Sequence, residues 1–238
     1  IKNSKIEFIT FEKFEKIIKT SIEENYLLLT IDDAFESFYV NAWPILKNKQ
    51  IPFVLFVSTR EIGKHGYMNW EQIKELDTSN LVTIGNHSHS HEYLIDWKEN
   101  KIKSDLETSI KIFEKKLGYS PKIFSYPFGE YSIILKKIVS DLNFEFAFGQ
   151  HSGVIDPTKD FLELPRFPIN EKYGDLKRFK SIIQTLPFPY ENITPENRYL
   201  KQDENPPDIK IKFFDNLINI KNINCYSNEG NIWSKSDI

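Results

Sequence analysis

Three of the five histidines in the chain lie within five residues, in the stretch His87-Ser88-His89-Ser90-His91. Neutral imidazole is a common nitrogen ligand for first-row metals, and His87 and His91 are four residues apart. On a helical turn after the apolar run Leu81–Ile84, both rings would lie on one face and could bind one ion. A solvated polar loop, or histidines bonded to backbone carbonyls, is the alternative. The clustering favours a metal site, which needs a third ligand from elsewhere in the chain.

An aspartate pair, Asp32-Asp33, follows the apolar run Tyr26–Ile31 and can supply that third ligand. Adjacent side chains on a strand point in opposite directions, so the two carboxylates are expected to differ in role. One would bind the metal with His87 and His91, leaving a coordination position for water as in catalytic zinc sites. The other would act as general base on that water. Taken alone, the pair would favour a turn or a helix N-cap, but the downstream His87 and His91 and the matching positions after strands favour catalysis.

Apolar runs and amphipathic stretches alternate along the first 185 residues. Continuous apolar runs are typical of strands buried on both faces, whereas apolar residues three or four apart are typical of helices. Strands are predicted over 26–31, 52–57, 81–84, 122–125 and 144–148, the last with alternating polarity, and a short extended piece over 162–167. Helices are predicted over 11–18, 35–46, 69–76, 100–117, 131–142 and 173–185. Asn69 is a plausible N-cap, Gly118 a C-terminal cap, and Pro44 is expected to bend or end its helix.

The repeated strand-then-helix order predicts a parallel α/β architecture. Polar clusters follow several of the predicted strands, at their carboxyl ends, where parallel sheets and barrels place their active sites. Asp32-Asp33, His87–His91, Tyr126–Gly129 and His151 are therefore expected to converge on one rim of the sheet.

Composition limits the classes of protein to which the chain can belong. Its 238 residues, 40% of them hydrophobic, suffice for one large domain or one domain with an appendage. A net charge of −3 without a block of like charges gives no support for nucleic acid or anionic membrane as a partner. The single cysteine, Cys225, excludes an intrachain disulfide, and no apolar run is long enough to span a membrane. Because the chain starts at Ile1 and its one methionine is Met68, we expect a processed or trimmed product, compatible with removal of a secretion signal.

Prolines become frequent after residue 185. We expect residues 1–185 to form the catalytic domain and 186–238 to form a Pro-rich linker with a small β-rich extension. Alternating residues over 209–213 and 218–220 predict exposed strands in that extension.

Three short motifs, in this order, resemble those of the polysaccharide deacetylases of carbohydrate esterase family 4. Thr30-Ile31-Asp32-Asp33-Ala34 resembles Thr-Phe-Asp-Asp-Gly, and His87–His91 matches His-Ser/Thr-x-x-His. Ser125-Tyr126-Pro127-Phe128-Gly129 resembles Arg-x-Pro-Tyr/Phe-Gly without its arginine. The resemblance extends to Arg166. It implies a distorted (β/α) barrel and metal-dependent removal of acetyl groups from N-acetylated sugars.

The resemblance also implies roles for individual residues. Asp32 would be the general base, and the Phe128 backbone N–H would stabilise an oxyanion. The ligands of one divalent metal ion, expected to be zinc, would be Asp33, His87 and His91. The rest of the third motif is expected to bind substrate, namely Tyr126, Pro127 and Gly129.

The chain departs from the family pattern at three positions. Ala34 replaces a glycine, which requires that this position avoid a backbone conformation reserved for glycine. Ser125 stands where the family arginine holds the catalytic aspartate, and Arg166 resembles an arginine that some members supply from a later strand; a surface arginine is the alternative. The late Leu-x-His motif, which carries the general acid, is absent. His151, flanked by glycines, is the substitute, with His65 as the other candidate, and His89 is expected to bond the scaffold.

The expected function is hydrolysis of N-acetyl groups on N-acetylhexosamine units of a polysaccharide, with release of acetate. An O-acetyl esterase using the same metal site is one alternative, and a catalytically inactive glycan-binding homologue, favoured by the missing Leu-x-His, is another. A polymeric substrate implies an exported location: periplasmic, cell-surface or extracellular.

Overall fold

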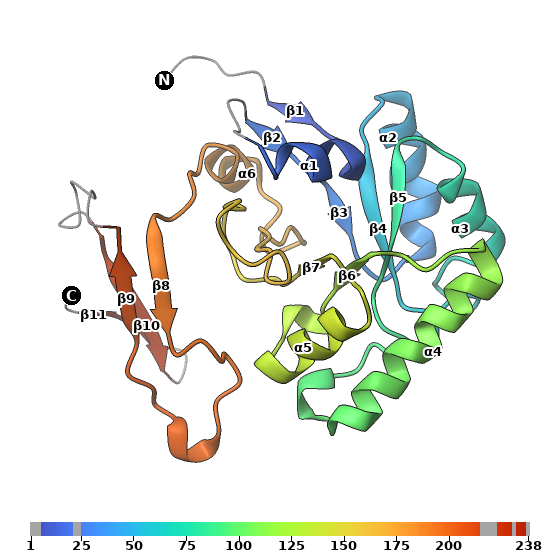
Figure 1. Ribbon diagram of the computed structural model, residues 1–238. Helices are drawn as coiled ribbons and strands as arrows, with labels where there is room; N and C mark the ends of the chain where they lie inside the picture. Colours follow the sequence, from blue (N-terminus) through green and yellow to red (C-terminus); the bar gives the residue numbers. More distant parts are fainter. Residues whose placement is uncertain (1–5, 21–24, 215–222, 230–231, 237–238) are drawn as a thin grey trace. The chain divides into compact units, whose positions relative to one another are not determined.

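Five parallel strands form the central sheet, and their order in space follows their order in the chain. The computed structural model describes residues 6–20, 25–214, 223–229 and 232–236. The sheet order is β3-β4-β5-β6-β7, with every pairing parallel (Figure 1). The strands are β3 (Thr30–Ile31), β4 (Phe53–Val57), β5 (Val82–Asn86), β6 (Ile123–Ser125) and β7 (Phe146–Phe148). The predicted parallel α/β architecture is thus confirmed.

Helices connect these strands and cover the two faces of the sheet. They are α1 (Phe11–Ile17), α2 (Trp43–Asn48), α3 (Trp70–Asp77), α4 (Glu99–Leu117), α5 (Ile133–Asp141) and α6 (Leu176–Ile182). A π-helical turn covers Phe38–Ala42, and 3₁₀ turns cover Leu94–Asp96, Pro127–Gly129 and Gln202–Glu204. As predicted, Asn69 is the N-cap of α3, where it forms a capping box with Gln72, and the left-handed Gly118 ends α4.

Strand β4 shows why the apolar runs are continuous. All five of its residues are buried, and alternate side chains enter different parts of the core. Phe53, Leu55 and Val57 pack in a cluster with residues of α2, α3 and α4, whereas Val54 and Phe56 pack in a second cluster with α1. A strand covered on both faces needs apolar residues at every position.

Two predicted strands differ from expectation. Residues 26–31 form two short strands: β2 (Tyr26–Leu27), which pairs with β1 (Glu7–Phe8), and β3, which pairs with β4. The run is half-buried, not buried on both faces, because β3 is the edge strand of the sheet. The expected alternation over 144–148 is also wrong for β7, whose three residues are all buried.

The predicted helix over 35–46 contains a change of helix type. The π-helical turn comes first, and α2 follows directly with Pro44 in its first turn. Pro44 therefore lies where the helix type changes, and the helix continues beyond it. Val40, an apolar residue of the π-helical turn, is 58% exposed.

The chain divides into two compact units: Ile1–Pro187 with Asn197–Tyr199, and Phe188–Glu196 with Leu200–Ile238. In the second unit, β8 (Tyr190–Thr194) pairs antiparallel with β9 (Lys210–Phe213), and β10 (Cys225–Glu229) with β11 (Ile232–Ser236). The strand expected over 209–213 is confirmed as β9, and the one expected over 218–220 lies outside the described residues. The assignment of 1–185 and 186–238 as catalytic domain and extension stays a prediction. Among the described helices, none combines the length and the apolar character needed to cross a membrane.

Gly85 in β5 provides a test of core packing next to the histidine stretch. A Cβ at this position would lie 2.4 Å from Phe56 Cδ1 and 3.1 Å from Ile123 Cγ1. We expect Gly85→Ala to lower the free energy of unfolding by about 1–3 kcal/mol, because overpacking displaces the neighbouring side chains. Urea denaturation measures this change.

Gly118→Ala is the matched control. Nothing lies within 4 Å of a Cβ there, so the expected cost is about 1 kcal/mol, from the left-handed φ of 86° alone. A loss at Gly118 as large as that at Gly85 would contradict the packing explanation.

Candidate active site

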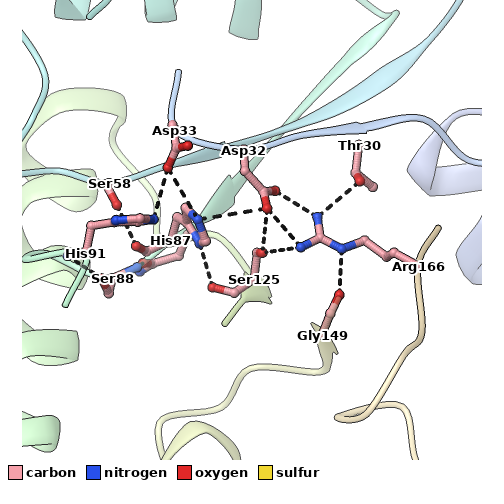
Figure 2. A network of polar contacts seen from close by, with 11 residues as sticks. Thr30, Asp32, Asp33, Ser58, His87, Ser88, His91, Ser125, Gly149 and Arg166 are labelled. Carbon is pink, nitrogen blue, oxygen red and sulfur yellow. Dashed lines mark hydrogen bonds and ion pairs between the residues drawn. The ribbon is translucent and has the colours of Figure 1, made fainter. Parts of the chain in front are cut away.

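The polar residues at the carboxyl ends of the strands lie together in one cluster (Figure 2). Asp32 and Asp33 follow β3, His87 follows β5, Ser125 ends β6, and Gly149 follows β7. Because parallel strands direct their carboxyl ends to the same edge, residues 117 positions apart in the chain come into contact range.

Asp33, His87 and His91 form a compact group of candidate metal ligands, the metal group. The Asp33 Oδ1 atom lies 3.0 Å from His91 Nε2 and 3.6 Å from His87 Nε2. One ligand atom from each of the three residues lies within 4.8 Å of the others. Two imidazole nitrogens and one carboxylate oxygen are a donor set that suits a divalent transition metal with an open position.

His87 and His91 lie on a non-helical turn, so the prediction that a helical turn carries them is wrong. Ser88 and His91 have left-handed φ angles of 67° and 53°, so the chain folds back after β5. The His91 N–H donates to Ser88 Oγ at 3.0 Å. On α4, Asp105 accepts from the N–H groups of His89 and Ser90, at 2.9 and 3.1 Å. These side-chain acceptors replace the hydrogen bonds that a helix would have provided.

The two candidate histidine ligands differ in environment. His87 is buried, and burial followed by its neighbour His91 lowers its pKa despite the nearby aspartates. Its Nδ1–H donates a hydrogen bond to the Ser125 carbonyl oxygen at 2.7 Å, which leaves the Nε2 lone pair free for a metal. Burial would lower the pKa of His91, but the hydrogen bond and charge of Asp33 raise it above its ordinary value.

Asp32 makes a two-point ion pair with Arg166. The guanidinium donates from Nη1 to Oδ1 and from Nη2 to Oδ2, both at 2.8 Å. Arg166 is itself held by the Gly149 carbonyl at 2.7 Å, Thr30 Oγ1 at 3.2 Å and Ser125 Oγ at 3.0 Å (Figure 2). Burial would raise the pKa of Asp32, but Arg166, with His87 and Ser125, lowers it below the ordinary value. The carboxylate is therefore ionised and oriented.

The two adjacent aspartates thus have separate partners. Asp32 faces Arg166 and Ser125, and Asp33 faces the histidines. Left-handed backbone at Asp33 (φ 73°) and Ala34 (φ 57°) accompanies this divergence. The expectation that Ala34 avoids a glycine-like conformation is therefore wrong. The strained alanine is fully buried, and its carbonyl accepts the Met68 N–H at 2.9 Å.

The third motif turns beside the metal group. Phe128 has a left-handed φ of 59°, and its ring centroid lies 4.8 Å from that of His91 and 4.0 Å from that of Tyr93. Tyr126, expected to bind substrate, is fully buried, and its hydroxyl donates to the Leu162 carbonyl at 3.0 Å. Its side chain is a core residue, which corrects that expectation, and Pro127 is buried too.

His151 lies outside the metal group, next to the third motif. It lines a pocket together with Phe128, Gly129, Glu130, Tyr131, Gln150 and Arg198. Burial, followed by the charges of Arg198 and Arg166, lowers its pKa to about 4. The ring is therefore neutral at pH 7. Of the other histidines, His65 is exposed, and His89 Nδ1 lies 2.8 Å from Thr59 Oγ1, away from the metal group as expected.

Several contributors to the site were missing from the sequence prediction. Ser125 links Asp32 to Arg166, and Asp105 holds the histidine turn. Asp105 and Ser109 are buried polar residues one turn apart on the otherwise apolar face of α4. Polar residues at core positions of a predicted helix could have indicated this role from the sequence. No pattern in the sequence pointed to Arg198.

Comparison with known proteins gives a consistent match. The polysaccharide deacetylase family profile matches residues 19–147. The poly-beta-1,6-N-acetyl-D-glucosamine N-deacetylase of Staphylococcus aureus is 26% identical over 178 residues, which cover 69% of this chain. The chain spans 60% of the length of that relative.

Solved structures show the same fold. The structure of IcaB from Ammonifex degensii has a TM-score of 0.69 at 24% identity, covering 76% of this chain and 83% of that one. The Streptococcus pyogenes deacetylase PplD, in complex with acetate, has a TM-score of 0.68 at 20% identity, covering 76% and 80%. The predicted distorted (β/α) barrel with a β-rich C-terminal part is confirmed: the parallel sheet forms a half-barrel.

The geometry of the metal group predicts that zinc affinity depends on His91 and not on the neighbouring His89. The metal-free protein should take up one equivalent of Zn²⁺, and His91→Ala should weaken its affinity by about 100-fold or more, because even the partners of metal ligands contribute 10–100-fold. Isothermal titration against a competing chelator measures the affinity.

His89→Ala is the matched control, two residues away. Its ring contacts Thr59 and not the metal group, so zinc affinity should stay at the wild-type value. Equal losses in the two variants would contradict the assignment of His91 as a ligand.

Proposed function

The chain belongs to the polysaccharide deacetylase family, and from this we propose that it is a metal-dependent hydrolase that removes N-acetyl groups from N-acetylhexosamine units of a polysaccharide. Acetate and a free amino sugar would be the products. The observation that carries the proposal is the separation of two adjacent carboxylates: Asp32 is held by Arg166 while Asp33 joins two histidines.

The residues of the metal group fit a divalent ion. Asp33 Oδ1 and the two Nε2 atoms are close together, and the Ser125 carbonyl fixes the His87 tautomer that a metal requires. We propose zinc as the ion, because borderline-soft zinc accepts this nitrogen and oxygen donor set. When bound, such an ion supplies a water of lowered pKa and an electrophile for the substrate carbonyl.

Asp32 is proposed as the general base. It is ionised, oriented by two hydrogen bonds from Arg166, and its Oδ2 lies 3.9 Å from His87 Nε2, next to the metal group. In this position it would accept a proton from the attacking water. Arg166 would keep the carboxylate oriented and prevent it from becoming a fourth ligand.

Other chain atoms would act on the substrate. The backbone N–H of Phe128, on the turn that packs against His91, is proposed to donate to the developing oxyanion. His151 is proposed to protonate the leaving amine. Since its ring is neutral at pH 7 in the free protein, substrate must raise its pKa before it can donate. Gly129 lines the adjoining pocket and is proposed to contact substrate.

The substrate is proposed to be an N-acetylated polysaccharide or oligosaccharide of the kind named for the Staphylococcus aureus relative. A polymer of this kind would be reached outside the cytoplasm, so we propose an exported protein. Residues 1–185 would form the catalytic domain, and 186–238 an extension.

Asp32→Asn tests the general base. We expect kcat for acetate release from N-acetylglucosamine oligomers to fall by about 100-fold or more, because the amide cannot accept the proton. Zinc content should be unchanged, since Asp33 and the histidines are intact. Near-native kcat would contradict the assignment of Asp32.

Acetylated xylan serves as the comparison substrate for the wild-type protein. A preference for xylan over N-acetylglucosamine oligomers would identify an O-acetyl esterase.

His151→Ala tests the general acid. If His151 donates the proton, kcat on N-acetylglucosamine oligomers should fall by about 100-fold, because an amine leaves poorly without protonation. An activated ester such as 4-nitrophenyl acetate, whose leaving group needs no proton, should be hydrolysed at the wild-type rate. Equal effects on the two substrates would mean that His151 has a different role.

A further inference from the structure

A pocket with a volume of about 290 Å³ lies next to the third motif, in the first compact unit. Its lining includes two basic side chains, Arg198 and His151, and one acidic side chain, Glu130. The family profile ends at residue 147, so both basic residues lie beyond the matched segment.

Arg198 lies in the segment Asn197–Tyr199, and each of its three residues contacts other residues of the first unit. The Asn197 Oδ1 atom accepts the Ile133 N–H at 3.4 Å, at the start of α5. The Tyr199 hydroxyl donates to Asp96 at 3.0 Å. Between them, the Arg198 guanidinium lies over the Tyr131 ring, 5.3 Å from its centroid. These contacts hold a cation at the pocket wall.

The charge of Arg198 is not neutralised by an ion pair. In the described part of the chain, no carboxylate lies within ion-pair distance of its guanidinium, although Glu130 lines the same pocket. Arg166, by contrast, is fully engaged with Asp32, Gly149 and Ser125. Arg198 is therefore free to bind an added anion.

His151 is the second group that lacks a partner. Its Nδ1 atom is buried and forms no hydrogen bond with the described residues. The Gly149 backbone approaches so closely that a Cβ there would lie 2.8 Å from this Nδ1. A buried nitrogen without a partner is costly. Among the described residues, the pocket therefore contains an unpaired guanidinium and a ring nitrogen without a hydrogen-bond partner.

We propose that this pocket binds a carboxylate, with Arg198 as the residue that recognises it. A guanidinium presents parallel N–H donors that match the two oxygens of a carboxylate, and such charge-assisted pairs are stronger than neutral ones. This binding goes beyond the proposed hydrolysis and does not require turnover. The carboxylate has two sources: released acetate, or an acidic sugar next to the reacting unit.

The test measures carboxylate binding by the full-length, zinc-loaded protein. Sodium acetate and sodium glucuronate are titrated, with neutral N-acetylglucosamine as the uncharged comparison, and Kd is obtained from ligand-observed NMR. Arg198→Gln should weaken carboxylate binding by about tenfold or more. Glu130→Gln should strengthen it, because it removes the one negative charge in the lining. Circular dichroism checks that each variant is folded.

Arg178→Gln is the matched control, because Arg178 also lies over a tyrosine, 5.4 Å from the Tyr173 centroid, but does not line the pocket. The carboxylate affinity of Arg178→Gln should equal that of the wild type.

The outcomes for the two carboxylates separate the possible ligands. Tighter binding of glucuronate than of acetate would identify an acidic sugar as the ligand, and the reverse would identify released acetate. Equal Kd values for wild type and Arg198→Gln would overturn the proposal. So would carboxylate binding that disappears on removal of zinc, which would place the anion on the metal. Neither result depends on deacetylation, so a failed proposal here is distinguishable from a failed enzyme assignment.

Discussion

The ion pair between Asp32 and Arg166 is the interaction on which the rest of the site depends. It joins the first strand of the sheet to a segment 134 residues later, through two hydrogen bonds of 2.8 Å. Removing one partner of a largely buried pair typically costs about 3–5 kcal/mol, because the other charge is left without compensation. The same pair keeps Asp32 ionised and turned away from Asp33. Without it, the Asp32 carboxylate would lose the contacts that separate it from the proposed metal ligands Asp33, His87 and His91.

Backbone strain is concentrated at the same edge of the sheet. Asp33, Ala34, Ser88, His91 and Phe128 all have positive φ angles, although none is glycine. Each such residue costs roughly 1–2 kcal/mol, so the surrounding contacts must hold the backbone in place. Asp105 does this for the histidine turn, and the Met68 N–H does it for Ala34. The strain redirects the chain sharply after β3, β5 and β6, and after β3 it directs the consecutive side chains of Asp32 and Asp33 to different partners.

Charge is distributed unevenly around the site. The metal group combines one carboxylate with two imidazoles, and the neighbouring pocket contains Arg198 and His151 with a single acidic residue. The hydrolysis proposed for this chain would release an anion and an amine, and the Arg198 guanidinium, unpaired among the described residues, would give the anion a place apart from the metal group. The segment that carries Arg198 is far from the three motifs in sequence but is held on the same unit by α5 and Asp96.

The sequence by itself determined the strand-and-helix order, the capping residues of α3 and α4, and the candidate residues of the metal group, because periodicity and residue type are local properties. Asp32, Asp33, His87 and His91 could be named since their positions after apolar runs imply one shared edge. Only the tertiary structure decided that Arg166 holds Asp32, that Tyr126 is a core residue, and that Ala34 is strained. Those outcomes depend on local φ angles and on the packing around single side chains, which the pattern of residue types along the chain does not fix.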